Sequence, residues 1–214
     1  NWLNACPARY VDMPIHAESV SAVGATAGAT GGPELMAQSH GSQAMSLRML
    51  IRNIDLASPT VTGGACMSAI PLSGAGSGLV LPALLSGTAL VVAPSQATST
   101  LVNYIERYEV VRLFLTPSQL IDLLDLPPDD LARLRSLRQI IYGTESMPVP
   151  KLWEALQHFG PILQQGYGSA EVLPPVTMLS ASDHRKALES SNPELLRSSG
   201  KVACGVQVEI VDRS

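Results

Sequence analysis

The chain has 214 residues, of which 46% are hydrophobic and 15% charged, and its formal net charge is −4 at pH 7. This length suffices for one substantial α/β domain, and the apolar content excludes an intrinsically disordered chain. The net negative charge, without a dense block of Lys and Arg, argues against nucleic-acid binding. No run of about 18 apolar residues predicts a membrane span.

The cysteines and the first residues of the chain indicate the cellular compartment in which the protein is expected. Cys6, Cys66 and Cys204 lie far apart without CxxC or Cys/His spacing, so the sequence indicates neither a disulfide framework nor a zinc site. A reducing compartment, the cytoplasm, is the expectation. The first residues include no Met and no signal-peptide pattern. We therefore expect a fragment of a longer protein.

Hydrophobic periodicity predicts short strands that alternate with helices. Strands of this kind are buried runs of apolar residues, whereas the helices carry apolar residues on one face. In chain order the sequence predicts a strand at 19–23, a buried helix at 79–85, a fully buried strand at 89–93, a helix at 99–108, a strand at 110–115, a helix from 118 to 124, a helical run at 130–137, a strand at 139–142, a helix at 149–159 and a strand at 162–165.

Repeated β-α units of this length predict an α/β fold of the doubly wound type, with a mostly parallel sheet and helices on both faces. Ligands of such sheets bind beyond the carboxyl ends of the strands, which points to the junctions at Thr116, Gly143 and Gly166. Residues 180–199 are polar and charged and are expected to form an exposed excursion. Residues 200–212 predict a C-terminal β-hairpin that turns at Cys204 and Gly205.

Three loops are candidates for chemistry. Residues 24–33 read GATAGATGGP, and small residues let backbone N–H groups approach a polyphosphate. The segment is not a GxxxxGK[ST] loop, because Glu34 follows its proline, and by itself it is better explained as a flexible surface loop.

The second and third loops follow consecutive predicted strands, and they read YGTE at 142–145 and GYGSAE at 166–171. Glycines at the carboxyl edge of a sheet let a flat base lie against the backbone. Tyr167 offers a stacking face, and Glu171 can hold a divalent cation beside phosphates. Each loop alone is equally well explained as a turn. Neighbouring parallel strands would bring the two loops together, and this favours a site.

The order of these segments resembles the adenylate-forming superfamily of acyl-CoA synthetases, aryl-acid ligases and nonribosomal adenylation domains. Residues 26–33, followed by Ser39 and His40, resemble its phosphate loop, T-S-G-T-T-G-x-P-K-G…[ST]-H. Four further segments match in the family order over nearly the whole chain, namely PLSGAG at 71–76, LRQIIYGTE at 137–145, GYGSAE at 166–171 and SGKVACGVQVEIVD at 199–212.

The resemblance implies activation of a small carboxylic acid with ATP and Mg²⁺, followed by transfer of the acyl group to a thiol, with coenzyme A as the expected acceptor. It assigns Glu171 as the catalytic residue and, with Thr30, as a metal ligand. Acid-binding residues would be Ser73, Gly74, Gly76 and Gly166. Nucleotide-binding residues would be Thr26, Gly28, Thr30, Gly31, Gly143, Thr144, Glu145, Tyr167, Gly168, Ser169 and Ala170.

Several positions depart from the family pattern. Glu34 stands where the phosphate loop has a lysine, and an anion in place of a cation beside a polyphosphate should weaken ATP binding. Ser73 and Gly74 replace the aromatic residue and the histidine of the acid-binding segment. Ser73 also stands where amino-acid-activating relatives place an aspartate. Because a buried ammonium without a carboxylate partner is costly, we expect a simple aliphatic or aryl acid.

The resemblance covers the central part of the family's large N-terminal domain, and we expect the C-terminal domain with the catalytic lysine to lie outside this chain. Alone it should be a poor catalyst. One alternative is a degenerate, non-catalytic scaffold or interaction module of the same fold, and another is an unrelated nucleotide-binding domain. His16, His158 and His184 lack a partner pattern and are expected to be surface or packing residues. The oligomeric state is not predicted.

Overall fold

The computed structural model describes residues 13–25, 34–54, 64–173 and 175–212, which form two compact units, Asn1–Met45 and Ser46–Ser214. In the first unit, β1 (Val20–Ala25) pairs antiparallel with β2 (Leu35–Ser39), and α1 (His40–Asn53) begins directly after β2. β1 confirms the strand predicted at 19–23. β2 and α1 were not predicted.

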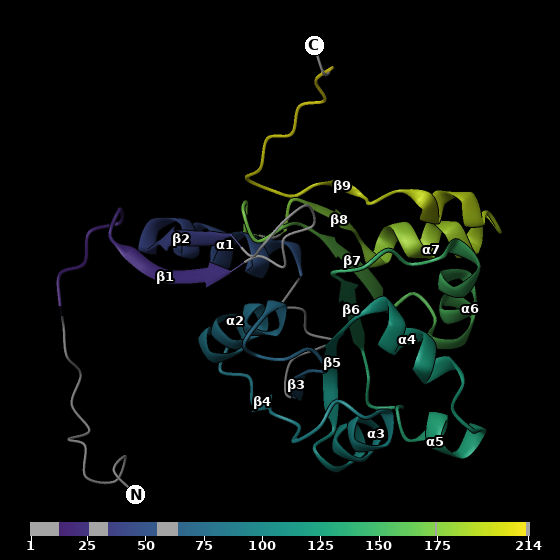
Figure 1. Ribbon diagram of the computed structural model, residues 1–214. Coiled ribbons are helices and arrows are strands. Elements are labelled where there is room, and N and C mark those ends of the chain that lie inside the picture. The colour runs from purple at the N-terminus through teal and green to yellow at the C-terminus, as the bar shows by residue number, and fades with distance from the viewer. Residues whose placement is uncertain (1–12, 26–33, 55–63, 174, 213–214) are drawn as a thin grey trace, which may run out of the picture. The chain divides into compact units, whose positions relative to one another are not determined.

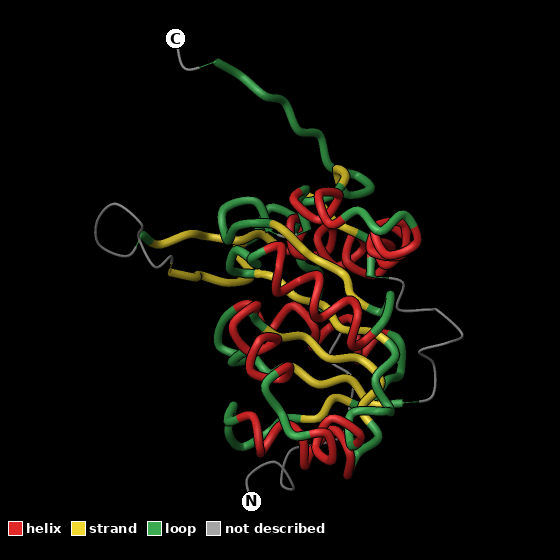
Figure 2. The backbone as a smooth tube through the Cα atoms, turned by 90° about the vertical axis from the view of Figure 1, so that its right-hand side faces the viewer, coloured by secondary structure: helices red, strands yellow, loops and turns green. Residues whose placement is uncertain are grey.

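The second unit is built on a seven-stranded sheet with the order β4-β3-β5-β6-β7-β8-β9 (Figures 1 and 2). The strands from β4 to β7 run parallel, and β8 and β9 are antiparallel to their neighbours, so the sheet is mostly parallel as predicted. The strands are β3 (Ala65–Ser68), β4 (Leu90–Val91), β5 (Val110–Leu115), β6 (Gln139–Gly143), β7 (Leu163–Tyr167), β8 (Thr177–Leu179) and β9 (Lys201–Val202).

Helices cover both faces of this sheet, as the β-α alternation predicts. Side chains alternate along each strand, so Leu113 and Leu115 belong to one apolar cluster and Phe114 packs against the other. The first cluster includes residues of α3 (Thr98–Arg107), α4 (Pro117–Leu124), α6 (Val149–Phe159) and α7 (Ala181–Glu189), and the second includes residues at the end of α1 and in α2 (Val80–Leu85). The remaining helical segments are η2 (Ala75–Leu79), α5 (Pro128–Ala132) and η3 (Pro193–Arg197).

The predicted elements agree best where a strand or helix has a clear apolar pattern. β5 and α6 have the predicted bounds, and Gly160 ends α6 with a φ of +72°. Two expectations about burial were wrong. α2 exposes Leu84 to 63%, and β4 is a short, half-buried strand. β4 is only half-buried because it lies at the edge of the sheet, where one side of the strand has no neighbouring strand among the described residues.

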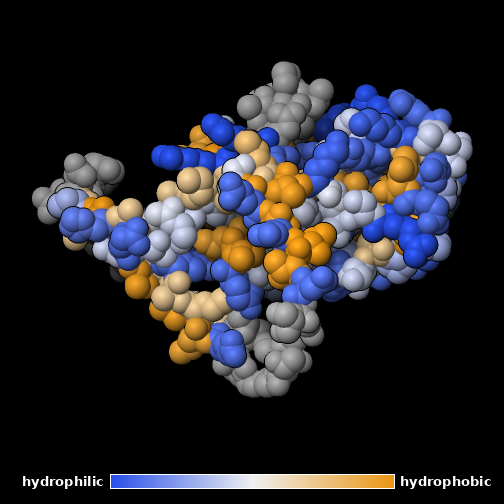
Figure 3. All heavy atoms as spheres, turned by 90° about the horizontal axis from the view of Figure 1, so that it is seen from above, coloured by the Kyte–Doolittle hydropathy of each residue, from blue (hydrophilic) through white to orange (hydrophobic). Residues whose placement is uncertain are grey.

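Residues 180–199 differ from the expected exposed excursion. They form α7 and η3, which pack against the sheet and against α6 and bury His184, Ala187 and Leu196. All charged residues of the segment except the half-buried Asp183 are exposed. The right-hand side of the molecule in Figure 3, where α7 lies in Figure 1, is mostly hydrophilic. A high charge content concealed an amphipathic helix, because only a few inward residues suffice to dock it.

The C-terminal residues follow the predicted hairpin in part. β9 pairs antiparallel with β8, and the expected turn at Cys204 and Gly205 is present, with a Gly205 φ of +91° and a hydrogen bond from Val206 N to Ala203 O. Residues 206–212 lie outside any strand. Within the described residues no helix combines the length and the apolar character needed to cross a membrane.

Candidate functional site

Two of the three candidate loops, at 142–145 and 166–171, lie at the carboxyl edge of the parallel strands. β3, β5, β6 and β7 run in the same direction, so their carboxyl ends meet at one edge of the sheet, where ligands of such folds bind. The acid-binding candidates Ser73, Gly74 and Gly76 follow β3, whereas Gly166 lies in β7. The two described candidate loops follow β6 and β7. Gln119 Nε2 also donates to Ala69 O at 2.8 Å, which ties the start of α4 to the loop after β3.

The loops after β6 and β7 are immediate neighbours, as predicted from the order of the strands. Gly143 and Gly166 are paired residues of the two strands. A Cβ atom on Gly143 would lie 2.5 Å from Gly166 O, closer than real Cβ atoms approach an oxygen. The absence of a side chain at Gly143 therefore permits the close approach of the two backbones at this edge.

The next two residues of the β6 loop have unusual features. Thr144 is exposed and adopts a φ of +73°, a left-handed conformation that β-branched residues rarely occupy. Glu145 Oε2 accepts hydrogen bonds from Ser118 Oγ at 2.7 Å and from Ser118 N at 3.3 Å. Ser118 was not among the predicted site residues.

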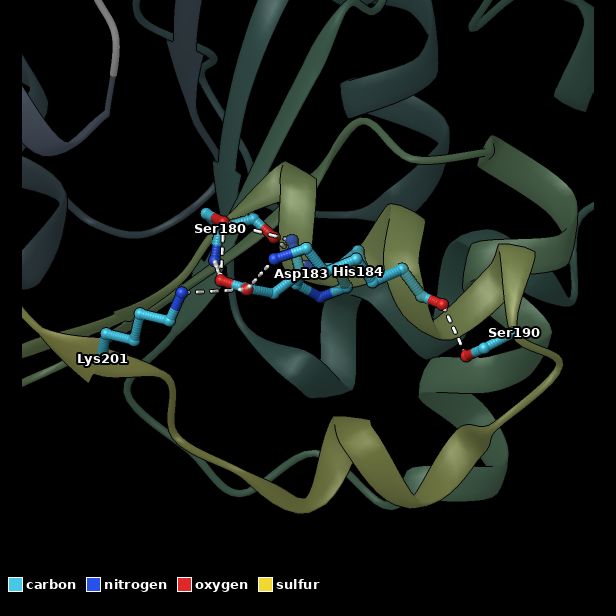
Figure 4. A network of polar contacts seen from close by, with 6 residues as sticks. Ser180, Asp183, His184, Ser190 and Lys201 are labelled. Atoms are coloured by element: carbon cyan, nitrogen blue, oxygen red, sulfur yellow. Dashed lines mark hydrogen bonds and ion pairs between the residues drawn. The ribbon is translucent and has the colours of Figure 1, made fainter.

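Behind the loop, Tyr142 and His184 form a buried pair. His184 Nε2 lies 3.0 Å from Tyr142 Oη, and His184 Nδ1 lies 2.8 Å from Ser180 O (Figure 4). Because a carbonyl oxygen only accepts, Nδ1 carries the proton and Nε2 accepts from the tyrosine hydroxyl. Burial lowers the pKa of His184 and raises the pKa of Tyr142. His184 is therefore a neutral packing residue. The sequence analysis expected either a surface residue or a packing residue at this position.

The loop after β7 presents an aromatic ring and a carboxylate. Tyr167 is 54% exposed, and Glu171 is exposed as well. Hydrogen bonds from the Ser169 side chain and from the backbone N–H of Glu171 lower the pKa of the Glu171 carboxyl, so Glu171 is ionised at neutral pH. Gly168 and Ala170 complete this turn.

The Glu171 carboxylate is a suitable ligand for Mg²⁺. In the described part of the chain, no group of three or more His, Cys, Asp or Glu side chains gathers that could hold a metal ion. Mg²⁺ is often bound through one or two carboxylates, with waters and substrate phosphates as the remaining ligands. An exposed, ionised Glu171 fits this mode of binding.

The acid-binding candidates differ in their surroundings. Ser73 and Gly74 are exposed in the turn before η2. Gly76 is buried, and a Cβ atom there would lie 2.7 Å from Pro71 O and 2.7 Å from Ser68 Oγ, so the packing of η2 already requires glycine. A Cβ atom on Gly166 would meet only Met178 Sδ at 3.6 Å.

The phosphate-loop candidates Thr26, Gly28, Thr30 and Gly31 lie outside the described residues. Glu34 directly precedes β2 and is exposed. The helix predicted from residue 118 begins at Pro117, but its capping box was not predicted, although the sequence carried a signal for it. Thr116 and Gln119 form a reciprocal capping box, and a T-x-x-Q spacing at a helix start is typical of that motif.

The sequence model of the family described as AMP-binding enzyme matches residues 4–214. The chain belongs to the AMP-binding enzyme family. This confirms the resemblance drawn from the five motifs and the α/β fold class.

Relatives of the chain are longer proteins. It is 33% identical over 114 residues, 53% of this chain and 20% of the relative, to the medium/long-chain-fatty-acid–CoA ligase FadD8 of Mycobacterium tuberculosis. The amide bond synthetase McbA from Marinactinospora thermotolerans superposes with a TM-score of 0.79 at 27% identity, over 97% of this chain and 39% of McbA. This AMP-binding chain therefore spans only part of the length of these relatives.

The fold is also shared with o-succinylbenzoate-CoA synthetase (MenE) from Bacillus subtilis. Its structure in complex with ATP and magnesium ion gives a TM-score of 0.71 at 22% identity, over 92% of this chain and 39% of MenE. MenE has also been solved in complex with its acyl-adenylate intermediate.

Proposed function

We propose that this AMP-binding chain belongs to an ATP-dependent enzyme that activates a carboxylic acid as its acyl-adenylate and transfers the acyl group to coenzyme A. The observation that carries the proposal is the pairing of Gly143 with Gly166, which brings two of the family's nucleotide-loop segments together at the carboxyl edge of the sheet. The name of FadD8, a fatty-acid–CoA ligase, supports acid activation, and the MenE complex supports ATP and magnesium on this fold.

The reaction divides into two displacements. A carboxylate oxygen of the acid attacks the α-phosphorus of ATP, the bond to the bridging oxygen breaks, and pyrophosphate leaves. The thiolate sulfur of coenzyme A then attacks the acyl carbonyl carbon, and AMP leaves. Mg²⁺, when bound, neutralises negative charge on the phosphates.

The residues of this chain have separate tasks in the proposal. The exposed Tyr167 ring stacks on the adenine, while the backbone of Gly143 and Thr144 receives the edge of the base. The Glu171 carboxylate would hold Mg²⁺, and Ser169 orients that carboxylate through its hydrogen bond. Thr26, Gly28, Thr30 and Gly31 are proposed to bind the phosphates.

The acid side of the proposal rests on Ser73, Gly74 and Gly166. Ser73 carries no charge that could pair with an ammonium group, so the proposed substrate is an aliphatic or aryl acid without an amine beside the carboxylate. The buried Gly76 shapes η2 in addition to any contact with the acid. The cytoplasm is the proposed compartment, because Cys66 and Cys204 are free thiols.

Binding of ATP to the intact protein, titrated with and without MgCl₂, tests this function. Glu171→Gln removes the charge that would hold the cation, so we expect the dissociation constant for Mg·ATP to rise about tenfold. Binding of ATP without Mg²⁺ should not weaken.

Glu154→Gln, at an exposed glutamate on α6, is the matched control and should bind Mg·ATP like the wild type. Absence of ATP binding at millimolar nucleotide would refute the function and favour the non-catalytic alternative. The acceptor is tested separately, by measuring thioester formation with coenzyme A against amide formation with an added amine.

A further inference from the structure

One contact at the carboxyl edge has no task in the proposed reaction. Glu145, which follows Thr144 in the β6 loop, is held by Ser118 from a different β-α unit, 27 residues earlier in the chain. Its Oε2 atom accepts from the Ser118 hydroxyl at 2.7 Å and from the Ser118 backbone N–H at 3.3 Å. The carboxylate is thus already engaged by protein donors.

Ser118 is well placed to hold a carboxylate. It is the second residue of α4, after the N-cap Thr116. The first N–H groups of a helix have no partner within the helix, and the positive end of the helix dipole attracts an anion. Glu145 therefore satisfies one of these donors and gains a second hydrogen bond from the hydroxyl.

The segment between these anchors has a strained backbone. Thr144 lies in the left-handed region with a φ of +73°, and such conformations persist only where the surroundings over-determine them. On one side, Gly143 is fixed by β7, where a Cβ atom would lie 2.5 Å from Gly166 O. On the other side, the two hydrogen bonds from Ser118 hold the Glu145 carboxylate.

We propose that Ser118 is a positioning residue for the nucleotide. By binding Glu145, it holds the backbone of Gly143, Thr144 and Glu145 in the conformation that receives the adenine edge. A loop that is held before binding loses less conformational freedom when the ligand arrives. Glu145 acts through the shape of its loop, and its carboxylate stays on Ser118. The inference rests on the proposed function.

The experiment uses the intact protein and compares Ser118→Thr with Ser118→Val, because threonine and valine have nearly the same shape. Threonine keeps the hydroxyl, whereas valine replaces it with a methyl group. We expect the dissociation constant for ATP to rise about tenfold in the valine variant and to stay within twofold of the wild type in the threonine variant. The preference for ATP over GTP should fall in the valine variant alone.

The preference between ATP and GTP separates positioning from a general loss of structure, because misfolding lowers the binding of both nucleotides equally. Ser99→Ala is the matched control, since Ser99 is exposed and is the second residue of α3. It should bind both nucleotides like the wild type. Ser118 is itself exposed, so removing its hydroxyl leaves no buried group unpaired.

A double-mutant cycle with Glu145→Ala completes the test. If both side chains act through one contact, the double variant with Ser118→Val binds ATP no more weakly than the weaker single variant. Additive losses would show that Glu145 contacts the nucleotide directly and would overturn the inference. Equal ATP binding by the valine variant and the wild type would also overturn it. A wild-type protein that binds no nucleotide would instead refute the proposed function.

Discussion

At the scale of single residues, burial changes the chemistry of His184 most. The imidazole is fully buried between Tyr142 Oη and Ser180 O, and both ring nitrogens are used in the neutral form. Protonation would add a proton to Nε2, which then could no longer accept the hydrogen bond from the tyrosine hydroxyl. It would also place a positive charge in a buried site. Burial accordingly lowers the pKa of His184 below its ordinary value of 6.5.

This shift predicts that stability depends on pH. Below about pH 6.5 the unfolded chain binds a proton at His184 while the folded chain does not, so stability falls as the pH falls until the folded pKa is reached. The slope contributed by one such group is at most about 1.4 kcal/mol per pH unit. His184→Gln should reduce the change of the free energy of unfolding with pH between pH 5 and 7. Urea denaturation at several pH values measures this change.

His158→Gln is the control, because His158 is exposed on α6. It should keep the slope of the wild type. An unchanged slope in the His184→Gln variant would mean that other groups cause the pH dependence.

At the scale of elements, α7 depends on a cap that the sequence analysis overlooked. Ser180 Oγ accepts from Asp183 N at 3.2 Å, and Asp183 Oδ2 accepts from Ser180 N at 3.1 Å. Burial raises the pKa of the Asp183 carboxyl, but the hydrogen bonds from Ser180 and the charges of Lys201 and Lys186 outweigh it and lower that pKa. Lys201 reaches this carboxylate from β9, at 3.7 Å (Figure 4), so the cap also links α7 to the edge of the sheet.

Ser180→Ala should therefore lower the free energy of unfolding by about 1 kcal/mol, as is typical of a lost N-cap. Ser182→Ala changes an exposed serine on the same helix and should leave stability within about 0.5 kcal/mol of the wild type. Chemical denaturation of both variants measures the difference. Equal stability of the two variants would contradict the role of the cap.

The sheet also contains a buried polar row that no local pattern predicts. Arg112 donates to Gln139 Oε1 and, from Nη1, to Cys66 Sγ at 3.5 Å. Gln139 Nε2 in turn donates to Gln164 Oε1 at 2.6 Å and to Ile54 O at 2.7 Å. The bonds between side chains cross β3, β5, β6 and β7, so each of them depends on the pairing of strands that are distant in sequence.

At the scale of the whole molecule, burial is distributed unevenly between the two units. Every residue of the two apolar clusters belongs to the second unit. In the first unit Val20, Val23 and Leu35 are 60–78% exposed, and an isolated two-stranded hairpin is only marginally stable in water. Local opening should therefore cost much less free energy in β1 and β2 than in β5 and β6.

Hydrogen exchange of the 214-residue chain, followed by mass spectrometry, checks this difference. We expect the amides of β1 and β2 to exchange at least about a hundredfold faster than those of β5 and β6, which corresponds to about 2.7 kcal/mol in opening free energy. Equal protection of the two regions would show that the hairpin opens only when the whole chain unfolds.

The sequence alone determined the features that depend on local periodicity and on motif order. The bounds of β5 and α6, the mostly parallel sheet and the family follow from apolar runs and from five ordered segments, because each run and each segment is encoded in residues close together in the chain. β2, α1 and α7 escaped prediction, since polar residues obscured their pattern. Only the tertiary structure decided that Ser118 holds Glu145 and that His184 is buried against Tyr142. These partners are 27 and 42 residues apart, and it is the pairing and packing of whole elements that brings them together.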